Sequence, residues 1–158
     1  MKALYDTLLF EKPDVRKLQN EINKTTIFKP LTASEMKTVS RHLQIRKFKK
    51  GERIFFEGDT GSALFIVLKG SVQISKTGRK KTIFAELGNG AFFGELALVH
   101  DVPRTASAVA SEDTLLVCLF RHDYEQIIRH YPLLGNKLQG IISKIIAQRL
   151  ASLIENTS

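Results

Sequence analysis

The sequence is poor in cysteine and has no long apolar run. Its one cysteine, Cys118, excludes an internal disulfide in a chain of 158 residues. The apolar run TLLVCLF around this cysteine predicts a buried strand position rather than a reactive thiol. No stretch of about 18 apolar residues is present to cross a bilayer, and the N-terminus lacks the basic start and small-residue cleavage site of a signal peptide. We therefore expect a soluble protein of the cytoplasm with no membrane span.

The groups that would perform catalysis are also missing. No nucleophile with its base, no pair of carboxylates and no metal cluster converges in the pattern. The four histidines are too scattered for metal-ligand spacing: His42, His100, His122 and His130. The glycines at 88, 90 and 94 do not match the dinucleotide fingerprint, because the third is one residue late and no βαβ unit surrounds it. The sequence therefore predicts a protein that is not an enzyme and holds no metal or cofactor.

Positive charge is in excess, with a net charge of +8 from 24 Lys and Arg against 16 Asp and Glu. This excess favours an anionic partner, but charge alone leaves open a nucleotide, a nucleic acid and an acidic protein surface. The basic clusters are short and lie at residues 46–50 and 79–81, where strand ends or a turn are expected. We interpret them as solvated turns rather than as a DNA-binding patch.

Apolar residues recur at helical spacing near both ends of the chain. This spacing predicts a helix over residues 13–24 and a second over residues 32–43, whose first residues TASE form a capping-box pattern. Toward the other end it predicts a helix over residues 123–130, a break at Pro132 and a longer helix over about residues 134–155.

Between these helices lie short strand-like runs separated by glycine turns. Eight such runs are present: IRKF, ERIFF, ALFIVLK, SVQIS, KTIFAEL, AFF, TASAVA and TLLVCLF. They predict a mainly β fold with flanking helices, an eight-stranded β-roll or jelly roll over about residues 45–120. We expect residues 1–30 to form an N-terminal helical segment. Residues 31–158 are expected to form one domain that ends in C-terminal helices over about residues 121–156.

One connection between two predicted strands carries a glycine, a carboxylate and an arginine. Amides of a helical turn over residues 95–98 would favour an anion, and Arg104 could pair with that anion through a forked pair of hydrogen bonds. Glu95 accepts hydrogen bonds and would repel a phosphate, so it suits sugar hydroxyls. The residues alone leave open that Glu95 and Arg104 form an ordinary salt bridge while the glycines serve turns.

Two motifs stand on this connection, FGELAL at residues 93–98 and PRTA at residues 103–106. Together they are similar to the phosphate-binding cassette of the cyclic-nucleotide-binding domain family, which includes domains of protein kinase A regulatory subunits, cyclic-nucleotide-gated channels and catabolite activator protein. The resemblance extends upstream through the runs GE, FEGD, FIV and KGSV, and it covers about residues 31–155. It implies the β-roll fold and a C-terminal lid helix.

The resemblance implies a ligand site with three parts. In the cassette, Arg104 pairs with the cyclic phosphate and Glu95 accepts from the ribose 2′-hydroxyl. The other cassette residues expected at the ligand, partly through backbone amides, are Gly94, Leu96, Ala97, Leu98, Thr105 and Ala106. The candidates for the apolar base slot are Ile74, Phe84, Ala85 and Leu87, although strand alternation puts Phe84 on the opposite side from Ala85 and Leu87, and each could simply pack in the roll. The lid helix is expected to contribute Ile146, Arg149 and Leu150.

Cyclic AMP is the ligand that this resemblance favours. Cyclic GMP is the second candidate, because the Thr105 hydroxyl could reach a guanine amino group. Binding would pull the lid helix over the base and so act on a protein effector. The apolar stripe of the same helix leaves open a homodimer formed through it.

The C-terminal end of the sequence bears on how such a sensor would signal. The chain ends at Ser158 with no room for a DNA-binding helix-turn-helix after the lid helix, and it has no second cassette. We therefore expect a stand-alone sensor or an excised regulatory domain. The rival hypothesis is a protein-interaction module that has the same fold and no physiological nucleotide ligand.

Overall fold

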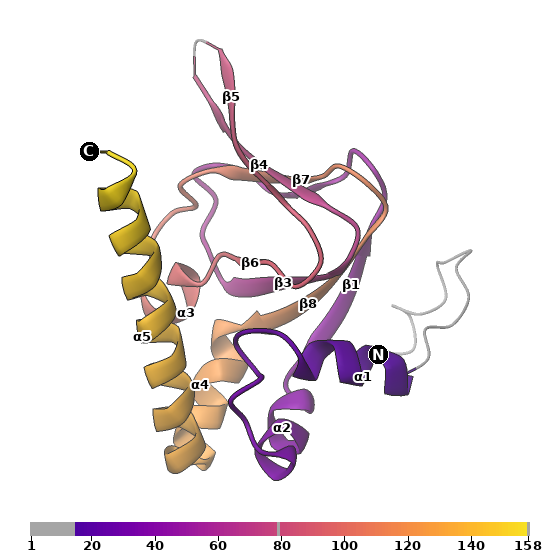
Figure 1. Ribbon diagram of the computed structural model, residues 1–158, viewed down its shortest axis with the longest axis vertical. Helices are drawn as coiled ribbons and strands as arrows, with labels where there is room; N and C mark the ends of the chain where they lie inside the picture. The colour runs from indigo at the N-terminus through magenta and orange to yellow at the C-terminus, as the bar shows by residue number, and fades with distance from the viewer. Residues whose placement is uncertain (1–14, 79, 158) are drawn as a thin grey trace.

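The fold is a β-roll with helices before and after it, as seen in a computed structural model that describes residues 15–78 and 80–157 (Figure 1). The helices of this part of the chain are α1 (Val15–Asn23), α2 (Ala33–Ser40), α3 (Leu96–Val99), α4 (Arg121–His130) and α5 (Pro132–Glu155). Its strands are β1 (Gln44–Phe48), β2 (Arg53–Phe55), β3 (Ala63–Lys69), β4 (Val72–Thr77), β5 (Lys81–Leu87), β6 (Phe92–Phe93), β7 (Ser107–Ala110) and β8 (Thr114–Phe120). The predicted fold class is confirmed, while the first two residues of the helix predicted from residue 13 lie outside the described residues.

The strands form two four-stranded antiparallel sheets. One sheet has the order β1-β8-β3-β6 and the other the order β2-β7-β4-β5. In the first sheet β3 pairs with β8, so that Phe65 lies opposite Cys118 and Ile66 lies opposite Val117. Figure 1 shows α1, α2 and α4 at one end of the roll, with α5 running along its side past α3.

The strands β3 and β8 are continuous apolar runs because both of their faces are covered. Side chains alternate between the two faces of a strand, so each strand supplies two separate cores. One core lies against the helices and includes Leu64, Ile66, Leu115, Val117 and Leu119. The other lies between the sheets and includes Ala63, Phe65, Val67, Leu116 and Cys118.

The helix ends follow from their caps. Thr32 and Glu35 make the predicted capping box, with amide-to-side-chain hydrogen bonds of 3.2 and 3.0 Å. The helix α2 nevertheless ends at Ser40, two or three residues earlier than predicted, because turns with i to i−3 hydrogen bonds follow it. The predicted break falls at Tyr131, and Pro132 is the first residue of α5, a position where proline loses no helical hydrogen bond.

The helices α4 and α5 lie in close backbone contact. A Cβ atom added to Gly135 would lie 2.7 Å from the Cα atom of Ile128, so the two helices approach each other where the glycine stands. Leu138 of α5 belongs to the helical core, which also contains Ile27 and Phe28 from the turn after α1. The described part of the N-terminal segment therefore completes the same core.

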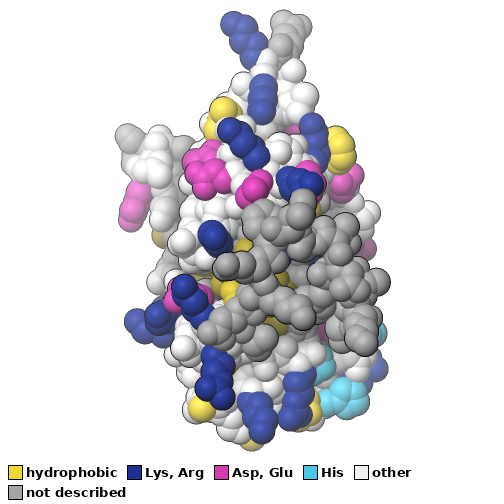
Figure 2. Space-filling view, turned by 90° about the vertical axis from the view of Figure 1, so that its right-hand side faces the viewer, with side chains coloured by type: hydrophobic (Ala, Val, Ile, Leu, Met, Phe, Trp, Pro, Cys, Tyr) yellow, Lys and Arg dark blue, Asp and Glu magenta, His cyan; other side chains and the backbone are white. Residues whose placement is uncertain are grey.

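Charged side chains are dispersed over the face that Figure 2 presents. Lys and Arg appear there from the tip of the β4–β5 hairpin down to the helical end, with Asp and Glu among them in the upper half. Lys49, Lys50, Lys80 and Lys81 are exposed at or beside turns, as predicted for these basic clusters. Arg46 and Lys47 are instead half-buried within β1, so the prediction of a solvated turn is wrong for these two residues. No helix within residues 15–78 and 80–157 is long and apolar enough to cross a membrane.

Cys118 is fully buried, which confirms the predicted strand position. Burial raises the pKa of its thiol from 9.0 to about 12, because the thiolate would lose its hydration. We expect no reaction of the native protein with a thiol-labelling reagent at pH 8 and one labelled cysteine per chain after denaturation. The raised pKa contributes to the free energy of unfolding. This contribution is complete below pH 9, and it is lost as the pH rises toward 12. Rapid labelling of native protein would contradict this expectation.

Candidate functional site

The connection from β6 to β7 begins with a sharp turn at Gly94. Its φ of +78° is a conformation that residues with a side chain rarely adopt. A Cβ atom at this position would also lie 2.5 Å from Nη1 of Arg104 and 2.8 Å from the carbonyl oxygen of Ala63. The glycine therefore lets the chain turn into α3 while its backbone stays against the arginine.

The side chain of Arg104 lies inside the roll and is only 9% exposed. Its Nη2 donates to the carbonyl of Ala63 at 2.9 Å, and its Nη1 donates to the carbonyl of Gly94 at 3.4 Å. The guanidinium lies over the ring of Phe55, 4.2 Å from the ring centre, and 5.6 Å from that of Phe65. The protein thus buries a rigid cation against aromatic rings and holds it by backbone carbonyls.

The charge of Arg104 is not neutralised by a carboxylate of the described chain. None of these residues forms an ion pair with Arg104, and its buried Nε–H has no hydrogen-bond partner. Burial lowers the pKa of Arg104 and the nearby Arg121 lowers it further, while Asp59 and Glu95 act in the opposite direction. A buried charge is costly unless an opposite charge and hydrogen bonds offset it. The site therefore suits an anion.

Glu95 pairs with Arg149 rather than with Arg104. Its Oε1 accepts from Nη1 of Arg149 at 2.5 Å, and the Glu95 side chain is only 10% exposed. Arg149 also donates to the carbonyl of Phe92 at 2.6 Å and lies over the Phe92 ring at 4.2 Å. The salt bridge between Glu95 and Arg104 that the sequence left open is thus wrong, and α5 is attached to the cassette at Glu95.

The remaining cassette residues differ in burial and in hydrogen bonding. The amides of Ala97 and Leu98 donate to the carbonyls of Gly94 and Glu95, so in this structure they stabilise the turn itself. The side chains of Ala97 and Leu98 are buried, whereas Leu96 is exposed. Of the last two residues, Thr105 is exposed and Ala106 is half-buried.

The candidates for a base slot fall into two groups. Ile74 and Leu87 are half-buried and pack against the core between the sheets, next to Ala85. Phe84 is 60% exposed, and the pairing of β4 with β5 shifts so that Ile74 lies opposite Ala85 and the next residue of β4 lies opposite Ile83. Phe84 is the extra residue of this bulge, which breaks the strict alternation that was expected of the strand.

The three candidates on α5 also differ in their surroundings. Ile146 is half-buried against the helical core. Arg149 stacks on the ring of Phe92 and forms an ion pair with Glu95, and Leu150 is 57% exposed. Sequence reasoning missed the groups that hold Arg104, namely the ring of Phe55 and the carbonyl of Ala63. Nothing local to either residue marks such a role, because both are far from the cassette in sequence.

The chemistry of this site suits a small anion that also offers hydroxyl groups. A buried unpaired cation and a nearby carboxylate lie on one loop, and a long helix is attached to that loop. The family model for the cyclic nucleotide-binding domain matches residues 45–131, more than half of the chain. The chain belongs to the cyclic nucleotide-binding domain family.

Individual relatives agree with this membership. The chain is 39% identical over 121 residues to the cyclic AMP receptor protein of Thermus thermophilus, covering 75% of this chain and 56% of the relative. It is 35% identical over 113 residues to the cAMP-dependent protein kinase regulatory subunit of Debaryomyces hansenii, covering 70% and 24%. The chain thus spans about half of the first relative and about a quarter of the second. Both relatives are named as receptor or regulatory proteins.

A solved structure supports the fold independently. The crystal structure of a cyclic nucleotide-binding domain from Methylobacillus flagellatus superposes with a TM-score of 0.77 at 26% identity. The match covers 89% of this chain and 80% of that one. The β-roll and its C-terminal helix are therefore the arrangement of a known cyclic nucleotide-binding domain.

Proposed function

We propose that this chain is a sensor that binds cyclic AMP through residues 93–106 and signals to a partner protein through α5. The observation that carries the proposal is Arg104, a buried guanidinium that no carboxylate of the described chain neutralises. We assign binding to residues 31–158, preceded by the helix α1 in the described part of residues 1–30. The proposal includes no catalysis and no cofactor.

The cyclic phosphate is the group that fits Arg104. Guanidinium binds phosphate through parallel hydrogen bonds, and each hydrogen bond to a charged group contributes about 1.5–3 kcal/mol. The unpartnered Nε–H, together with the second hydrogen of Nη1 and of Nη2, each of which makes one bond to a carbonyl, provides donors for the phosphate. A single negative charge there would also reduce the cost of burying the cation.

The ribose 2′-hydroxyl fits Glu95. Arg149 occupies Oε1 of this carboxylate, and no other described residue donates to Oε2. A hydroxyl can therefore donate to Oε2 while Arg149 stays in place, which would bring the sugar, the cassette and α5 together. Because the hydroxyl is neutral, this contact should contribute less to affinity than the contact of Arg104 with phosphate.

Exposed apolar groups provide surfaces for the purine. Ile83 and Phe84 on β5 are 55% and 60% exposed, and Leu150 and Leu153 on α5 are 57% and 64% exposed. Figure 1 shows the C-terminal half of α5 rising toward the end of the molecule that carries β5. We propose that adenine covers part of this surface, with cyclic GMP as the weaker ligand. The exposed apolar end of α5 also suits a protein effector or a second copy of the chain.

Isothermal titration tests the proposal directly. Cyclic AMP, cyclic GMP and the open-chain 5′-AMP are titrated separately into the purified protein at one salt concentration. We expect saturable binding of one equivalent of cyclic AMP, weaker binding of cyclic GMP and weakest binding of 5′-AMP, whose second phosphate charge and free geometry suit the site less well. No heat and no thermal shift with any of the three would refute the proposed function.

The attachment of α5 to the cassette gives a separate prediction. Arg149→Ala removes the ion pair with Glu95 and the stacking on Phe92, so the last turns of α5 should lose their anchor. We expect faster amide exchange in the last turns of α5 in the ligand-free protein, measured by hydrogen-deuterium exchange. Lys144→Ala, an equal charge loss on an exposed position of the same helix, is the control and should leave the exchange unchanged.

One observation favours a second candidate function. Because Arg149 already pairs with Glu95, the site is partly filled by the chain itself, as it would be in a protein-interaction module without a nucleotide. The titration separates the two candidates: such a module would not bind any of the three nucleotides, and Arg149→Ala would not create binding.

A further inference from the structure

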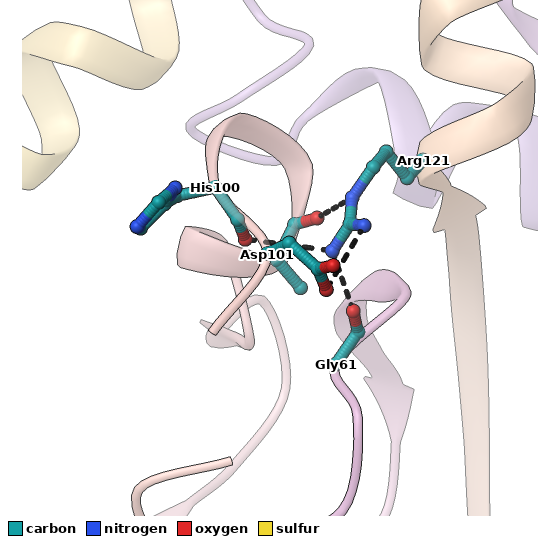
Figure 3. Close-up of polar contacts among 5 residues, drawn as sticks. Gly61, His100, Asp101 and Arg121 are labelled. Carbon is teal, nitrogen blue, oxygen red and sulfur yellow. Dashed lines mark hydrogen bonds and ion pairs between the residues drawn. The ribbon is translucent and has the colours of Figure 1, made fainter. Parts of the chain in front are cut away.

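Arg121 joins three parts of the molecule at one side chain. It is the first residue of α4, and its backbone amide donates to the carbonyl of Ser62 at 2.8 Å. Its Nε donates to the carbonyl of Ala97 in α3 at 2.6 Å, and its Nη2 donates to the carbonyl of Gly61 before β3, also at 2.6 Å (Figure 3). The cassette, the β2–β3 loop and α4 therefore meet at this guanidinium.

Two longer contacts complete the environment of Arg121. Nη2 also donates to the carbonyl of His100 at 3.4 Å, and Nη1 contacts Oδ1 of Asp101 at 3.4 Å (Figure 3). The Asp101 side chain is 73% exposed, so solvent screens this ion pair and it contributes little. The short bonds to the carbonyls of Ala97 and Gly61 are the principal contacts.

The position of α3 depends on contacts of this kind. A helix of four residues has no stability of its own, and the carbonyls at its end lack partners within the helix. Arg121 supplies donors to two of these carbonyls, those of Ala97 and His100. A shift of α3 would therefore either break these bonds or move Arg121 and the start of α4 with it.

Gly61, which accepts from Arg121, also lies next to Arg104. A Cβ atom at Gly61 would lie 3.1 Å from Cβ of Ala97 and 3.3 Å from Nε of Arg104. The glycine whose carbonyl accepts from Arg121 is thus packed against both α3 and the guanidinium of Arg104. On the other side, α4 is in backbone contact with α5 at Gly135.

We propose that Arg121 is a positioning residue that holds α3 and Gly61 to α4, so that a change of the cassette on nucleotide binding moves α4 and α5 together. The inference rests on the proposed function and deepens it. Arg121 does not contact the nucleotide in this scheme. Its role is to transmit the state of the cassette to the helix that signals.

The test compares Arg121→Met, which removes every side-chain donor at similar length, with Arg121→Lys, which keeps the charge and one donor group. Arg129→Met is the matched control, because it removes the same guanidinium group from an exposed position of α4. Affinity for cyclic AMP is measured by titration, and amide exchange of α4 and α5 is measured without nucleotide and at saturation. The melting temperature of each ligand-free variant reports any purely structural effect.

We expect Arg121→Met to bind cyclic AMP about tenfold more weakly, a typical factor for two coupled sites, while the ligand-dependent change in α5 exchange falls to less than half. Arg121→Lys should recover part of that change, and Arg129→Met should retain all of it. A full α5 response at saturation in Arg121→Met would overturn the inference, even with a lower melting temperature. If that variant does not fold, the same criterion applies to Arg121→Lys.

The outcome for the wild type separates this inference from the proposed function. Failure of the wild-type protein to bind cyclic AMP refutes the proposed function and the inference with it. Wild-type binding with an α5 response that is equal in all variants refutes only the role of Arg121.

Discussion

Arg104→Ala is expected to weaken cyclic AMP binding by roughly 30-fold to several thousand-fold, which corresponds to about 2–5 kcal/mol. The truncation removes the buried cation that would pair with the phosphate, and the nearby Arg121 is already engaged by the carbonyls of Ala97 and Gly61. The fold should survive, because the lost contacts with Phe55 and Ala63 are partly offset by the removal of a buried donor without a partner. Titration of cyclic AMP and a thermal melt of the ligand-free variant measure the two effects.

Two further variants make this experiment specific. Arg104→Lys keeps the charge but cannot form the forked pair of hydrogen bonds, so its affinity should fall between those of the wild type and the alanine variant. Arg41→Ala removes the same charge from an exposed position beyond α2 and should bind like the wild type. Wild-type affinity of Arg104→Ala would mean that the phosphate is held elsewhere.

Gly94→Ala is expected to damage both the fold and the site. The left-handed backbone costs a residue with a side chain about 1–2 kcal/mol, and an overpacked contact costs about 1–3 kcal/mol more. The added methyl group would meet Nη1 of Arg104 at 2.5 Å and the carbonyl of Ala63 at 2.8 Å, so the arginine must move. We expect a lower free energy of unfolding in chemical denaturation together with a large loss of affinity for cyclic AMP.

Gly140→Ala is the matched control with the opposite expected sign. Gly140 lies inside α5, and an added Cβ would meet nothing within 4 Å. Alanine is favoured over glycine in a helix by about 1 kcal/mol, so this variant should be more stable than the wild type and should bind equally well. An unchanged free energy of unfolding and unchanged binding in Gly94→Ala would contradict the structural account of the turn.

The strands and helices could be predicted from sequence because their determinants are local. Glycine turns delimit the eight strands, and the capping box at Thr32 marks the start of α2. The family could also be predicted, since residues 93–98 and 103–106 carry its motifs within one short segment. The predicted helix ends were wrong in two places. Turns with i to i−3 hydrogen bonds replace the last helical turn after Ser40, and Pro132 is the first residue of α5 rather than a break before it.

The partners of the charged residues could not be predicted in this way, because they depend on tertiary contacts. Arg149 lies 54 positions from Glu95 in sequence, and only the course of α5 brings the two together. The stacking of Arg104 on Phe55 depends on how the two sheets face each other. The bulge at Phe84 likewise has no local sign, since it arises from the pairing of β5 with β4.

The alternation along β3 and β8 has a consequence for how such a protein can change over evolutionary time. Because Phe65, Val67 and Cys118 face the space between the sheets while Leu64 and Ile66 face the helices, neighbouring codons in one strand affect opposite halves of the molecule. Substitutions on one face can alter the packing around Arg104, which lies over Phe65, and substitutions on the other face can alter the packing against the helices. The two cores can therefore diverge separately within a single strand.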